Sequence, residues 1–162
     1  LLFKLYRKKG TMKKSVDDLG IAAFILMHGF HISGRKSRTF YFEVENEQDL
    51  IEIDKLSFEY LSGPHRQFDT CLMSLKKIGE YLPTDNKEYK IVTDLGLAAF
   101  ILMHGFKVKG RKGRTIYFYV SDQDINEFEK LSFEYLSSTY HDFDSCLMIL
   151  KKVGEYTPND VA

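Results

Sequence analysis

The sequence predicts an α+β protein made of two α-β-β-α-α repeats. Residues 16–44 match 92–120 at 21 of 29 positions, and residues 54–83 match 129–158 at 20 of 30. Each copy holds an apolar segment typical of a buried helix, followed by the alternating pattern of a hairpin. We expect a pseudo-twofold pair whose hairpins form one four-stranded antiparallel sheet with helices on one face, because an isolated hairpin is marginal in water.

The chain divides into a basic N-terminal tail (1–14), a first repeat (15–83), a linker (84–90), a second repeat (91–158) and a C-terminal tail (159–162). Proline and polar residues mark the linker. The N-terminal tail carries six basic residues and no acid. Met12-Lys13-Lys14-Ser15 is typical of a natural start, so residues 1–11 are left out of the fold prediction.

The first predicted helix of each repeat is Leu19–Met27 and its copy. It is apolar on all sides, which favours a buried helix. Gly29 and Gly105 follow where a left-handed glycine ends a helix. Candidate N-caps are Ser15, Asp17 and Thr93, with Asp18 and Asp94 in the first turn.

A hairpin with a basic tip follows in each copy, over residues 30–44 and 106–120. β-branched and aromatic residues alternate along both strands. One face of each hairpin is expected in the core: Phe30, Ile32, Phe40, Phe42 and Val44, with Phe106, Val108, Ile116, Phe118 and Val120 as their copies.

Two further helices close each repeat. The first is predicted over 49–61 and 124–136, which share Lys-Leu-Ser-Phe-Glu-Tyr-Leu. The second is predicted over 69–81 and its copy. Its apolar stripe includes Cys71 and Cys146, so both thiols are expected to be buried and inert.

Composition excludes several classes of protein. The chain of 162 residues has 23 basic and 23 acidic residues and a formal net charge of zero. It is therefore neither a globally basic nucleic-acid binder nor an acidic tail. Two cysteines form no disulfide framework and indicate a reducing compartment. No apolar stretch is long enough to span a bilayer, so we expect a cytoplasmic protein with no membrane partner.

The hairpin tips are the first candidate site. Three cations over four positions recur in both copies and are suited to gripping phosphates: Arg35, Lys36 and Arg38, with Arg111, Lys112 and Arg114. The alternative is a solvated, charged turn that prevents edge-to-edge aggregation.

The outward face of the predicted sheet is the second candidate. Alternation places on it His31, Ser33, Thr39, Tyr41 and Glu43, then Lys107, Lys109, Thr115, Tyr117 and Tyr119. Exposed tyrosines among lysines suit the stacking of single-stranded bases. The alternative is that a partner subunit or the last helices cover this face.

No catalytic, cofactor or metal constellation is predicted. His28 and His104 close equivalent helices, where a dipole partner is favoured over a metal ligand. Glu59 and Glu134 recur in the shared helix, where a plain surface carboxylate is favoured over a paired acid site. We therefore expect a protein that is not an enzyme.

The order of elements resembles a small domain family of unknown function encoded by phages, prophages and bacteria. Three motifs carry the resemblance: Asp94-Leu95-Gly96-Leu97-Ala98-Ala99-Phe100, His104-Gly105-Phe106 and Arg114-Thr115-Ile116-Tyr117-Phe118. The resemblance implies a viral or mobile-element origin and a bacterial or infected-host cytosol. It supplies no activity.

Two functions from different classes follow as hypotheses. The first is a non-enzymatic nucleic-acid-binding protein that grips the backbone of a single or double strand with paired basic hairpins. The second is a structural or protein-interaction module, an assembly factor or inhibitor, that binds a protein through its sheet face. An internal pseudo-dimer is expected with either function.

Overall fold

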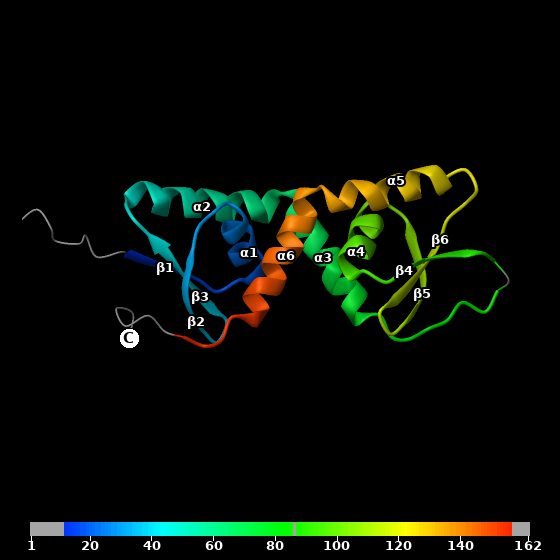
Figure 1. The fold of residues 1–162 in the computed structure, drawn as a ribbon, viewed down its shortest axis with the longest axis horizontal. Coiled ribbons are helices and arrows are strands. Elements are labelled where there is room, and N and C mark those ends of the chain that lie inside the picture. The colour runs from blue at the N-terminus through cyan, green and yellow to red at the C-terminus, as the bar shows by residue number, and fades with distance from the viewer. Residues whose placement is uncertain (1–11, 86, 157–162) are drawn as a thin grey trace, which may run out of the picture. The chain divides into compact units, whose positions relative to one another are not determined.

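The computed structural model describes residues 12–85 and 87–156 (Figure 1). The chain forms two compact units. Unit 1 holds the described residues up to Ser62 and those from Ser145 onward, and unit 2 is Gly63–Asp144. The units do not coincide with the sequence repeats, because the third helix of the first repeat belongs to unit 2.

Unit 1 is built around the antiparallel sheet β1-β3-β2. Its elements are β1 (Met12–Val16), α1 (Leu19–Met27), β2 (Ile32–Lys36), β3 (Thr39–Val44), α2 (Glu47–Ser62) and the C-terminal half of α6 (Thr139–Lys152). Along β3, Phe40, Phe42 and Val44 are buried, so one face of the sheet forms the core.

Unit 2 is built around the antiparallel sheet β4-β6-β5. Its elements are α3 (Pro64–Lys77), β4 (Tyr89–Val92), α4 (Leu95–Met103), β5 (Lys107–Lys112), β6 (Thr115–Tyr119), α5 (Ile125–Leu136) and the first turns of α6. Helices α3 and α4 pack against each other, although they come from different repeats.

The α+β class agrees with the structure, but the predicted sheet and repeat pattern are wrong. The described chain has two separate three-stranded antiparallel sheets, not one four-stranded sheet. Each repeat is β-α-β-β-α-α rather than α-β-β-α-α. The reason is that β1 and β4 pair with β3 and β6 inside their own units, which uses the edges expected to pair across a twofold axis. β4 begins within the 84–90 segment that the sequence marks as a linker.

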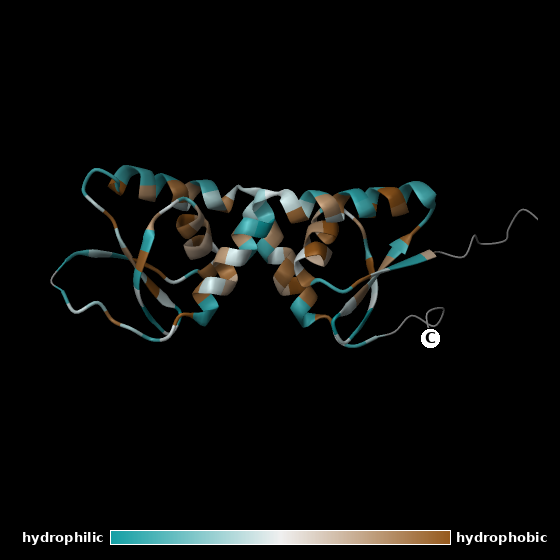
Figure 2. Ribbon diagram, turned by 180° about the vertical axis from the view of Figure 1, so that it is seen from behind, coloured by the Kyte–Doolittle hydropathy of each residue, from teal (hydrophilic) through white to brown (hydrophobic). Residues whose placement is uncertain are grey.

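The predicted bounds Leu19–Met27 are confirmed for α1, and α4 is its copy. The N-cap prediction is wrong: Asp18 and Asp94 take that position, and their carboxylates accept hydrogen bonds from backbone N–H groups three residues later, each at 2.8 Å. Gly29 and Gly105 adopt φ values of 95° and 96°, as expected for a left-handed helix end. Figure 2 shows α1 and α4 as largely apolar.

The predicted core face of the hairpins is only partly buried. Phe42 and Phe118 are fully buried, whereas Ile32 and Val108 are half-buried. A register shift lies directly after each of these two residues, between Ile32 and Gly34 and between Val108 and Gly110. The bulge leaves one extra residue in β2 and in β5, which interrupts their regular pairing with β3 and β6.

The prediction of buried cysteines is also wrong, because Cys71 and Cys146 are half-buried. The core positions of α3 are Phe68, Leu72 and Leu75, spaced four and three residues apart on one face. Cys71 lies at the margin of that face, where partial burial still raises the pKa of its thiol.

Among the described residues, no helix combines the length and the apolar character that crossing a bilayer requires. The two most apolar helices, α1 and α4, have nine residues each.

Candidate functional site

Two of the six predicted tip cations, Arg35 and Arg111, donate hydrogen bonds to carbonyls at helix ends. In unit 2 the Arg111 guanidinium donates Nη1 hydrogen bonds to the carbonyls of Ile78 at 2.7 Å, Lys76 at 3.3 Å and Leu75 at 3.4 Å. Ile78 is the C-cap of α3. A cation bonded to the last carbonyls of a helix also complements its dipole. The Nη1 group of Arg111 is therefore already hydrogen-bonded within the protein.

Arg35 plays the corresponding part in unit 1. Its Nη1 donates to the carbonyl of Val153 at 2.9 Å, just after α6, and its Nε donates to the carbonyl of Ser37 at 2.9 Å. The guanidinium also lies 5.4 Å from the ring centroid of Phe40. Arg35 and Arg111 are therefore partly buried, and each joins a hairpin to the end of a helix through hydrogen bonds.

The chain after each of these helices pairs with the hairpin edge. Tyr81 and Arg111 exchange backbone hydrogen bonds of 2.9 and 2.7 Å, and Tyr156 and Arg35 do the same at 2.8 and 2.6 Å. Glu80 Oε1 accepts a hydrogen bond of 3.1 Å from the N–H of Gly113 at the hairpin turn. In each unit the hairpin therefore holds, through hydrogen bonds, the segment of chain that follows the helix.

Four of the six predicted tip cations stay exposed: Lys36 and Arg38 in unit 1, and Lys112 and Arg114 in unit 2. Within the described ranges they form no ion pair. They surround hairpin turns in which Ser37 and Gly113 have φ values of 54° and 58°. These cations are available to a ligand, with two in each unit.

The outer face of the unit 2 sheet gathers aromatic and basic side chains. Tyr117 and Tyr119 alternate with buried Ile116 and Phe118 along β6, so they point away from the core. In the strand register, Tyr119 lies between Tyr89 of β4 and Lys107 of β5. Residues directly opposite each other in an antiparallel pair share a face. We call Tyr89, Tyr117, Tyr119, Lys87, Lys107 and Lys109 the tyrosine–lysine face.

Charged groups lie close to two of these tyrosines, Tyr89 and Tyr119. Lys87 Nζ lies 4.9 Å from the ring centroid of Tyr119. The Tyr89 hydroxyl donates a hydrogen bond to Asp85, which raises the pKa of Tyr89 to about 12. The same bond, followed by the nearby Lys87 and Lys109 charges, lowers the pKa of Asp85. The Asp85 carboxylate is therefore already hydrogen-bonded, and the ammonium groups of Lys87 and Lys109 lie close to it.

The equivalent face of unit 1 has different chemistry. Lys13 and Glu43 stand opposite each other and form a 3.8 Å ion pair. Ser15 lies opposite Tyr41, and the Thr39 hydroxyl donates to Asp17 at 2.7 Å. Glu43 occupies the position that Tyr119 has in the second repeat. Only one predicted tyrosine, Tyr41, is present here, and the neighbouring ion pair carries no net charge.

Four members of the tyrosine–lysine face are predicted from the sequence, whereas Tyr89 and Lys87 are not. Both lie in the segment 84–90, for which the sequence predicts a linker. The available signal for a strand was the aromatic and β-branched composition of this segment, with Tyr89, Ile91 and Val92.

The remaining candidates have structural roles. The Nδ1 atoms of His28 and His104 donate to the carbonyls of Phe24 and Phe100, each at 2.7 Å. Glu59 and Glu134 are exposed and pair with the lysines four residues earlier, at 3.9 and 3.4 Å. Within residues 12–85 and 87–156, no three His, Cys, Asp or Glu side chains are grouped to hold a metal ion.

No family model, curated protein or solved structure matches this chain.

Proposed function

We propose that this protein is a non-enzymatic binder of single-stranded nucleic acid, and that it binds through the tyrosine–lysine face of unit 2. The observation that carries the proposal is the grouping of Tyr89, Tyr117 and Tyr119 on two adjacent strands, with lysines at their margins. Sheet surfaces of this kind bind single strands by stacking bases on aromatic rings while cations contact the phosphates.

The positions of the lysines favour a single nucleic-acid strand that runs across the β-strands of the sheet. Lys107 lies beside Tyr119 on β5, and Lys87 lies over the same ring from the β4 side. Lys112 and Arg114 continue the positive charge to the hairpin turn. Cations on both sides of the rings fit a chain of phosphates with bases between them.

Stacking is tested with Tyr117→Ala and Tyr119→Ala. Each lost base contact is expected to weaken binding by about 1–3 kcal/mol. The matched control is Tyr41→Ala, because Tyr41 is the equivalent of Tyr117 on the unit 1 face. The measurement is fluorescence anisotropy of a labelled oligothymidylate and oligouridylate of about 12 nucleotides, a length within known site sizes.

The phosphate contacts are tested through the dependence on salt. Replacing Lys87, Lys107 and Lys109 by Ser is expected to reduce the slope of log K against log salt by about 2, from about 0.7 per contact. The tyrosine variants should leave the slope nearly unchanged. Equal losses from Tyr41→Ala, or no binding of any oligonucleotide at about 50 mM salt, would contradict the proposal.

A further inference from the structure

Helix α2 has a second apolar face opposite the one that it buries. Its core side consists of Ile53, Leu56 and Tyr60. On the other side, Phe58 is 73% exposed, Ile51 is 59% exposed and Leu61 is 44% exposed. Spacings of seven and three residues place these three side chains in one row along the helix. We call them the outward stripe of α2.

The same feature recurs in α5, in a shorter form. Phe133 is 77% exposed and Leu136 is 64% exposed, at the positions equivalent to Phe58 and Leu61. Asn126 stands where α2 has Ile51. Single exposed apolar residues are ordinary on a protein surface, but a row of them including a largely exposed phenylalanine indicates a binding surface.

Acidic residues border the outward stripe of α2. Glu47, Glu52 and Glu59 lie on the helix beside it, and Lys55 is the one base of α2. Lys55 pairs with Glu59 at 3.9 Å. Asp54 also lies beside the stripe, three residues after Ile51, and pairs with Lys14 of β1 at 3.4 Å. The apolar row is therefore bordered by carboxylates, of which Glu47 and Glu52 are not engaged in an ion pair with a described residue.

We propose that the outward stripe of α2 binds an amphipathic helix with a basic rim, supplied by a protein partner. Apolar anchors along one helix face match the face of a second helix packed along it. Basic flanks on that partner helix would neutralise Glu47 and Glu52. A second copy of α2 would instead bring two acidic rims together, which disfavours self-association through this face.

The full chain is tested with a labelled 18-residue peptide of leucine and lysine, with its leucines on one helical face. Two controls are a scrambled peptide of the same composition and a leucine–glutamate peptide with the original pattern. At about 0.15 M salt we expect saturable binding with a dissociation constant on the order of 10 µM. Binding of both controls should be at least about tenfold weaker.

Variants assign the binding to α2. Phe58→Ser should raise the dissociation constant at least about tenfold, while Phe133→Ser has a smaller effect because α5 lacks the third anchor. Met73→Ser is the matched control, since Met73 is also about half exposed, at 49%, but lies on α3. Each variant removes an exposed side chain, and circular dichroism checks that it stays folded.

Four results would overturn this proposal. The first is that the scrambled peptide binds as tightly as the patterned one, and the second is that Phe58→Ser leaves binding unchanged. The third is a dimer in sedimentation equilibrium that Phe58→Ser dissociates, which assigns the stripe to a second copy. The fourth is that the peptide binds only after residues 1–11 are deleted, which makes the basic N-terminal segment of this chain the occupant. The oligonucleotide measurements do not depend on any of these outcomes.

Discussion

Arg111 and Ile78 are joined by a 2.7 Å hydrogen bond from the guanidinium to the carbonyl of the residue that caps the C-terminus of α3. The arginine comes from the hairpin of the second repeat and the helix from the first. The neighbouring backbone pairing of Tyr81 with Arg111 reinforces the joint. Gly110 allows this approach, because a Cβ there would lie 2.5 Å from the Tyr81 carbonyl oxygen. The fold of unit 2 thus depends on contacts between the two repeats.

Arg111→Ala is expected to lower the free energy of unfolding by about 2 kcal/mol, because it removes charged hydrogen bonds to helix-end carbonyls. Urea unfolding measures the change. Arg114→Ala is the control: Arg114 is exposed, so its effect should stay within about 0.5 kcal/mol. An Arg111 variant as stable as the Arg114 variant would show that the capping contacts contribute nothing.

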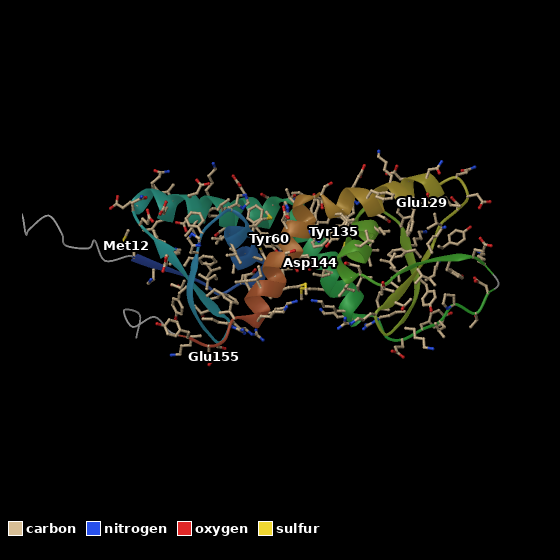
Figure 3. All side chains as sticks on the ribbon, viewed as in Figure 1. Met12, Tyr60, Glu129, Tyr135, Asp144 and Glu155 are labelled. Atoms are coloured by element: carbon tan, nitrogen blue, oxygen red, sulfur yellow. The ribbon has the colours of Figure 1, made fainter. Side chains whose placement is uncertain are left out.

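Gly96→Ala should destabilise unit 2 by about 1–3 kcal/mol through overpacking. A Cβ at this buried position would lie 2.6 Å from Asp144 Oδ2 and closer still to the Tyr135 hydroxyl, the two groups labelled in Figure 3. Gly79→Ala is the matched control, because a Cβ there has no neighbour within 4 Å. Thermal unfolding of the two variants should differ clearly. Similar melting temperatures would contradict the tight packing around Gly96.

Stability should fall in alkaline solution because of Tyr135. Burial, followed by the nearby Asp144 charge, raises the pKa of this fully buried tyrosine above its usual 10.0. The unfolded chain therefore loses this proton before the folded chain does. The stabilisation is complete below pH 10 and is lost as the pH rises toward the folded pKa. Tyr135→Phe should flatten this loss when unfolding is measured between about pH 8 and 11; an unchanged pH dependence would exclude Tyr135 as its source.

The fragment 63–144 should fold alone, since it contains unit 2 in one continuous piece. The fragment 84–158, which is the predicted linker together with the second sequence repeat, lacks α3 and leaves the packed face of α4 uncovered. We expect the first fragment to be a monomer with cooperative unfolding. The second should dimerise by exchanging its last helix, or bind a hydrophobic dye. Sedimentation and denaturant titration distinguish these outcomes. A monomeric, cooperative 84–158 fragment would show that the repeat itself is the folding unit.

The secondary structure could be predicted from local patterns where those patterns were strong. The apolar run of α1 fixed both of its ends, and the glycines after α1 and α4 marked the stops. The strand β1 has three polar residues out of five, and β4 has only four residues, so neither gives a clear alternating pattern. Missing them removed one strand from each sheet and led to the wrong prediction of a joint four-stranded sheet.

The exchange of helices could not be predicted, because α3 and α6 carry nearly the same apolar pattern. Phe68, Leu72 and Leu75 have Phe143, Leu147 and Leu150 as their copies, and all six are buried. Such a pattern predicts that the helix packs through one face, but it does not indicate which of the two repeats supplies the surface it packs against. The roles of Arg35 and Arg111 were hidden for a related reason. The sequence shows that a residue is arginine, but it does not distinguish an arginine that binds backbone carbonyls from one that binds phosphate.

The discontinuity of unit 1 has a consequence for biosynthesis. Residues 12–62 leave the ribosome before unit 2 does, yet their unit is completed only by residues after 144, including the buried Leu147 and Leu150. Unit 2 is complete before those residues are made. Folding during translation therefore proceeds from the middle of the chain, against the usual order in which N-terminal parts fold first. Until α6 emerges, residues 12–62 lack the helix that completes their unit, so we expect this stretch to depend on chaperones more than unit 2 does.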